Sequence, residues 1–182
     1  MRRIERRDAQ ETGLFVQLVR NNKVFKTHKG GKTASWSALV VVGDRNGKVG
    51  VGIGKARGVP DAIRKGEEAG RRAMISVPMI AGTIPHDVRS KMGATLVWLK
   101  PASPGTGVVA GGAVRVILEA AGLVDVLAKV FGSRNPVNCA WATMKALSQL
   151  RAPEEVAQAR GLAVRELVPW ISKLQAEASG DA

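Results

Sequence analysis

The chain has 182 residues, a formal net charge of +13 and a pI near 10.7. Such a strong positive balance is atypical of soluble enzymes and typical of proteins that bind nucleic acid. The charge is also uneven, because residues 1–80 hold 17 Lys and Arg against 7 Asp and Glu, net +10, whereas residues 81–182 hold 11 against 8, net +3. We therefore expect the two halves of the chain to have different roles.

Hydrophobic residues make up 45% of the chain, which is enough for one or two packed cores. The single cysteine, Cys139, excludes a disulfide framework within the chain and indicates a reducing compartment, the cytoplasm. No apolar run approaches the ~18–20 residues of a membrane span. The first residues, MRRIERR, lead into polar and acidic residues instead of an apolar stretch, so we predict no signal peptide and a basic, flexible N-terminus over 1–13.

A basic segment near the N-terminus is the strongest functional signal. Between Thr12 and Gly43 there is no acidic residue, and Lys or Arg recurs at every third position at Arg20, Lys23, Lys26, Lys29 and Lys32. Like charges repel, so such a segment gains little by folding unless a polyanion neutralises it. The β-prone runs 14–19 and 36–42 flank it, which predicts a strand-connecting arm or hairpin that turns at Gly30-Gly31.

The next elements complete a first domain over 14–79. A turn at 44–47 leads into a strand over 48–55, in which glycines occupy one face and Val or Ile the other. This glycine face suits either a packed helix or direct contact with nucleic acid. Pro60 predicts the start of a helix that runs to Val77, with its apolar face formed by Ala62, Ile63, Ala69, Ala73, Met74 and Val77. The opposite face is basic, and it is either simply solvated or a further RNA contact.

Residues 78–85 carry two prolines and Gly82, which predicts a domain boundary. The second half then reads as a βαβα domain over 80–152, with strands at 95–100 and 124–130, a loop at 101–107 and a largely apolar helix at 110–121. Arg115 and Glu119 form the one polar stripe of that helix. Asn135-Pro136 predicts the start of a second helix that runs to about Leu150. Residues 153–182 are expected to form a helical extension and a tail.

Catalytic and ligand motifs are weak. Glycines at 105–107 and 111–112 precede a helix, but their spacing fits neither the dinucleotide fingerprint nor the P-loop. His28 and His86 lie far apart without a second ligand, so we predict no metal site and no cofactor. No serine or carboxylate pair has a catalytic context, and we predict that the chain is not an enzyme. Aromatic residues are scarce, which favours a folded, double-stranded RNA read by shape, with Phe25 exposed and Trp36 in the core.

Several motifs carry a family resemblance. They include Lys29-Gly30-Gly31-Lys32, Asn46-Gly47-Lys48-Val49-Gly50, PASPGTG at 101–107 and GSRNPVN at 132–138. Over about Leu14 to Val168 the chain closely resembles the bacterial small-subunit ribosomal protein S-five family.

That resemblance implies an α+β fold. Its parts are an N-terminal domain like a double-stranded-RNA-binding module, with a three-stranded antiparallel sheet plus a helix, and a C-terminal two-layer α/β domain with a left-handed βαβ crossover. It also implies a structural protein that binds 16S ribosomal RNA, contacts small-subunit ribosomal proteins four and eight, and contributes to translational accuracy. The family lies on the side of the ribosome where mRNA enters, which makes mRNA a candidate partner.

Candidate site residues follow from the basic segments and from the resemblance. For ribosomal RNA they are Arg20, Asn22, Lys23, Phe25, Lys26, His28, Lys29, Gly30, Gly31, Lys32, Lys48, Lys55, Arg57, Arg64 and Lys65. For the protein-facing interface they are Gly105, Thr106, Gly107 and Arg115. Two alternatives stay open, namely an enzyme that uses the C-terminal domain and a free-standing regulator that binds double-stranded RNA.

Overall fold

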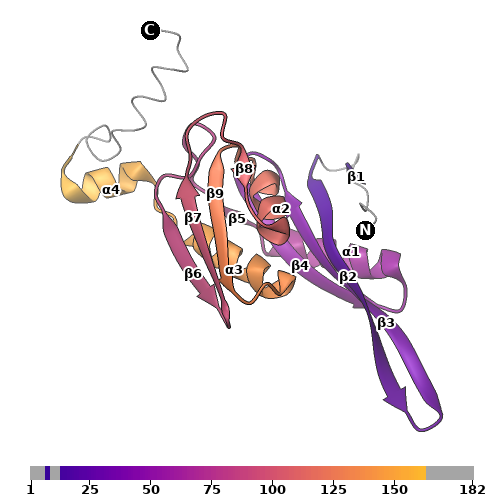
Figure 1. The fold of residues 1–182 in the computed structure, drawn as a ribbon. Coiled ribbons are helices and arrows are strands. Elements are labelled where there is room, and N and C mark those ends of the chain that lie inside the picture. Colours follow the sequence, from indigo (N-terminus) through magenta and orange to yellow (C-terminus); the bar gives the residue numbers. More distant parts are fainter. Residues whose placement is uncertain (1–6, 9–12, 163–182) are drawn as a thin grey trace.

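The computed structural model describes residues 7–8 and 13–162. Most of the predicted flexible N-terminus and the predicted tail lie outside these residues. The described chain forms two β-sheets with their helices, and a long hairpin projects from the body at the N-terminal end (Figure 1).

The first sheet has the strand order β1-β2-β3-β4-β5. Its three main strands, β2 (Phe15–His28), β3 (Gly31–Gly43) and β4 (Lys48–Ala56), pair antiparallel, which confirms the three predicted strands. Two short edge strands, β1 (Arg7–Asp8) and β5 (Ile75–Ser76), extend the sheet beyond the prediction. A strand of two residues leaves no periodic pattern, so the sequence could not indicate either of them.

β2 and β3 pair along their whole length, from Phe15 opposite Gly43 to His28 opposite Gly31. The basic segment is therefore a two-stranded ribbon that continues the sheet strands, with a register shift between Leu18 and Arg20. Residues 22–33 are all exposed, whereas Val40, Val41 and Val42 at the other end of β3 are fully buried. The buried end anchors the exposed ribbon to the body of the protein.

Helix α1 (Val59–Arg72) covers the glycine face of β4. A Cβ atom on Gly50, Gly52 or Gly54 would lie about 2 Å from a backbone oxygen of α1, so only glycine permits this approach. The packed-helix alternative is therefore confirmed for this face. The predicted helix end at Val77 is wrong, because α1 ends at Arg72 and the chain enters β5. Part of the predicted apolar face is also wrong, because the buried positions of α1 are Ala62, Gly66 and Gly70, and Ala73 is exposed.

The second sheet has the strand order β6-β7-β9-β8. Its strands are β6 (Val88–Met92), β7 (Thr95–Pro101), β8 (Val108–Val109) and β9 (Val126–Gly132), with helices α2 (Gly112–Ala121) and α3 (Pro136–Ser148) and, beyond the sheet, α4 (Pro153–Arg160).

β8 and β9 run parallel with α2 between them, so a βαβ unit is present, and its left hand stays a prediction. Its first strand is β8 and not the predicted strand 95–100, because that strand, β7, pairs antiparallel with β9. Strands β6 and β8 were missed by the sequence reading, and β9 lies two residues further along the chain than expected. The side chain of Asn135 caps α3 as predicted, because it accepts a hydrogen bond from the Val137 amide at 3.4 Å.

The two halves share one core. Helix α2 packs against β2, β3 and β4, and the buried cluster that contains Val41 and Val51 also contains Ile117 and Leu118 of α2. The turn between β3 and β4 rests on the end of α2, since the amides of Arg45 and Gly47 donate to the carbonyl oxygens of Ala120 and Ala121 at 3.0 and 2.9 Å. The first sheet is thus covered by α1 on one face and by the second half of the chain on the other.

Candidate nucleic-acid interface

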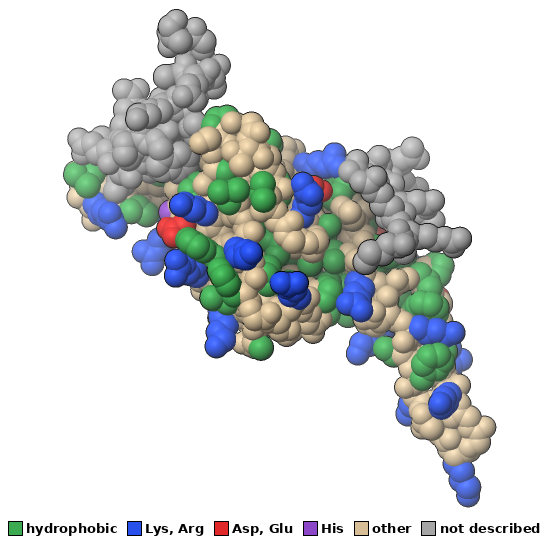
Figure 2. All heavy atoms as spheres, viewed as in Figure 1, with side chains coloured by type: hydrophobic (Ala, Val, Ile, Leu, Met, Phe, Trp, Pro, Cys, Tyr) green, Lys and Arg blue, Asp and Glu red, His purple; other side chains and the backbone are tan. Residues whose placement is uncertain are grey.

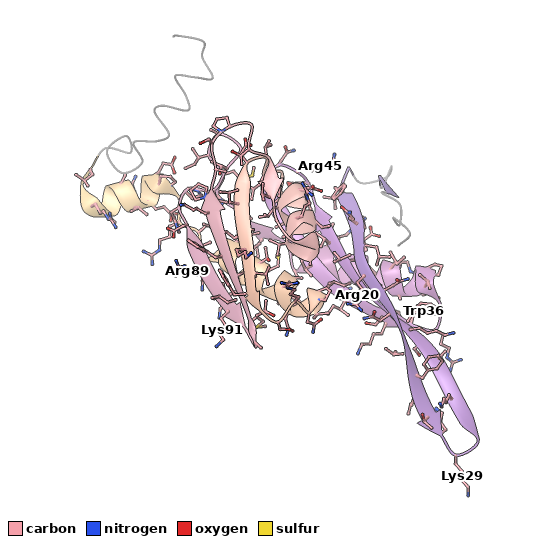
Figure 3. All side chains as sticks on the ribbon, viewed as in Figure 1. Arg20, Lys29, Trp36, Arg45, Arg89 and Lys91 are labelled. Atoms are coloured by element: carbon pink, nitrogen blue, oxygen red, sulfur yellow. The ribbon has the colours of Figure 1, made fainter. Side chains whose placement is uncertain are left out.

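The ribbon places its lysines on both faces and at its tip. Successive residues of a strand point to opposite faces, so Lys23 and Lys26, three positions apart, lie on opposite faces of β2. Lys32 pairs with Thr27 and shares the face of Lys23. Lys29 lies in the turn at the tip of the ribbon, where Gly30 adopts a positive φ of 122° (Figure 3). The three-residue spacing of the lysines therefore distributes positive charge over both faces and the tip of the ribbon.

One face of the ribbon also carries aromatic rings. The Lys23 ammonium lies 5.3 Å from the ring centre of Phe25 and 5.8 Å from that of Trp36 on the paired strand. Phe25 is 58% exposed, as expected. Trp36 was expected in the core, but it is only half-buried, because it lies where the ribbon leaves the body. The ring contacts hold the lysine side chain close to the strands.

The remaining predicted RNA residues are all exposed, but they do not form one cluster. Lys55 pairs with Ser37 at the base of the ribbon, and Arg57 follows β4. Lys48 lies at the other end of β4, where it pairs with Ser76, so the structure does not bring it to the ribbon. The others are Asn22, Gly31 and His28 on the ribbon, Arg20 at its base with its Nε donating to the Asn22 side chain at 3.0 Å, and Arg64 and Lys65 on α1.

Three of the predicted protein-facing residues, 105–107, lie in the loop between β7 and β8, and the fourth, Arg115, lies on α2. Gly105 and Gly107 have positive φ values of 82° and 75°, and the Gly107 amide donates to the carboxylate of Asp125 at 2.7 Å. The Thr106 hydroxyl donates to the Ser103 carbonyl at 2.7 Å. On α2 the side chains of Arg115 and Glu119 form the expected ion pair at 3.2 Å, and both are exposed.

Arg45 was not singled out from the sequence. It lies in the turn between β3 and β4 with a φ of 58°, and its guanidinium stacks over the Phe15 ring at 4.3 Å (Figure 3). With Glu119 and Val124 it lines a hollow of about 440 Å³ beside the start of β8. The turn signal at 44–47 was visible in the sequence, but the contact with α2 that orients this arginine arises only from the tertiary fold.

The described chain has no group of His, Cys, Asp and Glu side chains that could hold a metal ion. His28 lies on the ribbon, and the His86 ring accepts the amide of Arg151 at 3.3 Å. Burial raises the pKa of the Cys139 thiol above its ordinary value, which leaves it protonated near neutral pH. Over the same described ranges, no helix has both the length and the apolar character that crossing a membrane requires.

These features define an α+β protein with a basic β-ribbon, a surface typical of proteins that bind nucleic acid. Two family models match the chain, "Ribosomal protein S5, N-terminal domain" over residues 14–78 and "Ribosomal protein S5, C-terminal domain" over residues 90–160.

Curated relatives agree with the family models. The chain is 49% identical to a "Small ribosomal subunit protein uS5" of Chloroflexus aurantiacus over 175 residues, which cover 96% of the chain and 98% of the relative. It is 53% identical to the protein of that name from Bifidobacterium longum, over 93% of the chain and 72% of the relative. It is 51% identical to the protein of that name from Nocardia farcinica, over 96% of the chain and 81% of the relative. The chain therefore belongs to the ribosomal protein S5 family, which is a structural and non-enzymatic component of the ribosome, and the enzyme alternative is excluded.

Proposed function

We propose that this protein is built into the small subunit of cytoplasmic ribosomes and binds 16S ribosomal RNA with its β2–β3 ribbon. The observation that carries the proposal is the exposed ribbon itself, whose lysines occupy both faces and the tip while no acidic residue lies between Thr12 and Gly43. A ribbon that is charged on one face would lie on a single RNA surface. One that is charged all round fits between two backbone segments, with phosphates on either side.

The rings on the ribbon suggest how it is positioned. Phosphate contacts from Lys23, Lys26, Lys29 and Lys32 fix where the ribbon lies but carry no sequence information. The exposed Phe25 ring can rest on a base or a ribose at the RNA surface, next to the ammonium of Lys23. The basic residues of α1 and the end of β4 extend the contact along the body of the protein.

We further propose a division of labour between the two halves. The first domain, 14–79, carries net positive charge and the ribbon, and the second, 80–152, presents 105–107 and Arg115 to small-subunit ribosomal protein four. Small-subunit ribosomal protein eight is a further neighbour. Support comes from the exposure of Gly105 and Thr106 in the loop before β8 and of Arg115 on α2. By family resemblance, this side affects translational accuracy and lies where mRNA enters the ribosome.

Co-sedimentation with 30S particles in high salt tests the proposal. The full chain should stay with the particles after a high-salt wash. Salt screens the charges of loosely bound basic proteins, but it screens far less the contacts with neighbouring proteins and those of a ribbon enclosed by RNA. The matched variant, with Lys23, Lys26, Lys29 and Lys32 replaced by Gln, should be released at lower salt. A chain that leaves the particles as easily as an unrelated basic protein would instead support the free-standing regulator.

A further inference from the structure

The second sheet has a face that no element of the described chain covers. Helix α3 packs on β6 and β7, and α2 packs beside β8 and α3, so both helices lie on the same side of the sheet. Along β6 and β7 the residues that face the helices are buried, and on β9 they are buried at Val126 and half-buried at Ala128 and Val130. The alternate residues of the three strands are exposed or half-buried. These alternate residues form what we name the open sheet face: Arg89, Lys91, Leu96, Trp98, Lys100, Val109, Leu127, Lys129 and Phe131.

Cations and apolar side chains alternate across this face. The strand register places Trp98 between Arg89 and Lys129 in one row. In the next row Leu96 lies between Lys91 and Phe131. Neighbouring strands are about 4.8 Å apart and residues two positions apart about 6.6 Å. Trp98 therefore lies directly between two cations, and Phe131 lies two positions from Lys129.

The rings on the open sheet face are accessible in different ways. The Phe131 ring is 44% exposed near the end of β9, where β8 no longer pairs with the strand, and Leu127 is 38% exposed between β7 and β8. The Trp98 ring is half-buried beneath the Arg89 guanidinium, which lies 4.2 Å from the ring centre. Its indole Nε1 is covered and, within the described chain, donates to no acceptor. The Trp98 side chain therefore combines an aromatic ring that holds a guanidinium with an indole N–H that has no acceptor within the described chain.

The charge of this face has one sign. The strands β6, β7, β8 and β9 contain no acidic residue, and the nearest acidic side chain before β6 is Asp87. Figure 2 shows Lys and Arg side chains spread over these strands, with few acidic ones in view. Arg89 and Lys91 extend from the edge strand β6 (Figure 3). The second half of the chain has a net charge of only +3, so this clustering is local and does not follow from overall composition.

We propose that the open sheet face is a second RNA-binding surface, and that it takes unpaired nucleotides. Arg89, Lys91, Lys100 and Lys129 give this face four cations beside a single flanking carboxylate, that of Asp87. This excess matches a chain of phosphates, whereas a protein surface would need a comparable excess of carboxylates to match it. The exposed Phe131 ring offers a stacking platform, which a base can use only when it is not paired within a helix. This surface is distinct from the ribbon, lies on another sheet, and is suited to a different form of RNA.

Fluorescence anisotropy with two RNA probes tests the proposal on the full chain. The probes are a fluorescein-labelled dodecameric oligouridylate, which is unpaired, and an RNA duplex of the same length. Replacement of Phe131 by Leu should weaken binding of the oligouridylate by about fivefold or more, because stacking of one base on an aromatic ring contributes at least about that factor. Phe131→Tyr, which keeps the ring, should bind like the wild type.

The double variant Lys91→Gln/Lys129→Gln should lower the slope of log affinity against log salt for the oligouridylate by about 1.4, which is two phosphates on a single strand. A matched control, Lys145→Gln/Arg160→Gln, removes two exposed charges from α3 and α4 and should leave this slope nearly unchanged.

Two results would overturn the inference: equal oligouridylate affinity of Phe131→Leu and the wild type, or equal slopes for the two double variants. Either result would assign the open sheet face to a protein neighbour. If substitution of the ribbon lysines still abolished binding of the duplex, the proposed function would remain intact. Circular dichroism of each variant confirms that the fold is retained.

Discussion

A single methyl group on β4 should separate helix α1 from its sheet. A Cβ atom on Gly52 would lie 2.0 Å from the Gly66 carbonyl oxygen and 2.4 Å from the Gly70 amide nitrogen, whereas ordinary contacts begin near 3.4 Å. The obstacle is backbone on both sides, so no side chain can rotate away. Helix α1 must therefore move away from β4 by about 1.4 Å, the difference between 3.4 and 2.0 Å.

Overpacking of this kind costs about 1–3 kcal/mol and occasionally more. Alanine also restricts the unfolded chain, which returns about 0.4–1 kcal/mol of stability. We expect Gly52→Ala to lower the free energy of unfolding by about 1–2 kcal/mol, measured by urea denaturation followed by circular dichroism. The matched control is Gly112→Ala at the first turn of α2, where a Cβ meets no atom within 4 Å, and it should be neutral or stabilising. A Gly52→Ala protein within 0.5 kcal/mol of the wild type would refute this account of the glycine face.

Four further outcomes are expected. Arg115→Ala removes one exposed ion pair, so it should change stability by less than about 1 kcal/mol and leave RNA affinity intact, while altering the error frequency in a misreading reporter. Because the two halves share a core, urea unfolding followed by tryptophan fluorescence and by circular dichroism should give one coincident transition, and two separate midpoints would contradict this. The raised pKa of Cys139 predicts slow alkylation of the folded protein at neutral pH. It also predicts that the contribution of this thiol to stability is constant near neutral pH and falls as the pH rises through the ordinary pKa of a thiol, since the unfolded thiol then ionises first.

The main strands and helices could be predicted because their patterns are long. Alternation and turn residues located β3, β4 and the turn between them, and Asn135-Pro136 located the start of α3. The two-residue strands β1, β5 and β8 depend on neighbours that the sequence does not place beside them. The helix end at Arg72 was missed because Met74 and Val77 continue an apolar spacing, although their backbone had already left the helix.

The candidate site was predicted in composition but not in geometry. The charge repeat identified the ribbon residues, yet the continuous pairing of β2 and β3, which divides Lys23 and Lys26 between two faces, required the structure. Gly66 and Gly70 disfavour a helix when read locally, and their role appears only when β4 is packed against them. The open sheet face escaped notice because it depends on β6, whose sequence VRSKM is too polar to indicate a strand.

The salt dependence of RNA binding tests the central claim most directly. Affinity for 16S ribosomal RNA fragments should be measured across a salt series for the wild type and for the variant with Lys23, Lys26, Lys29 and Lys32 replaced by Gln. Its control removes the same number of exposed charges from the second half of the chain, at Arg134, Lys145, Arg151 and Arg160. We expect the slope of log affinity against log salt to fall by up to about three units in the ribbon variant and far less in the control, because each neutralised phosphate contributes about 0.7–0.9. Equal losses in the two variants would show that diffuse charge, and not the ribbon, binds the RNA.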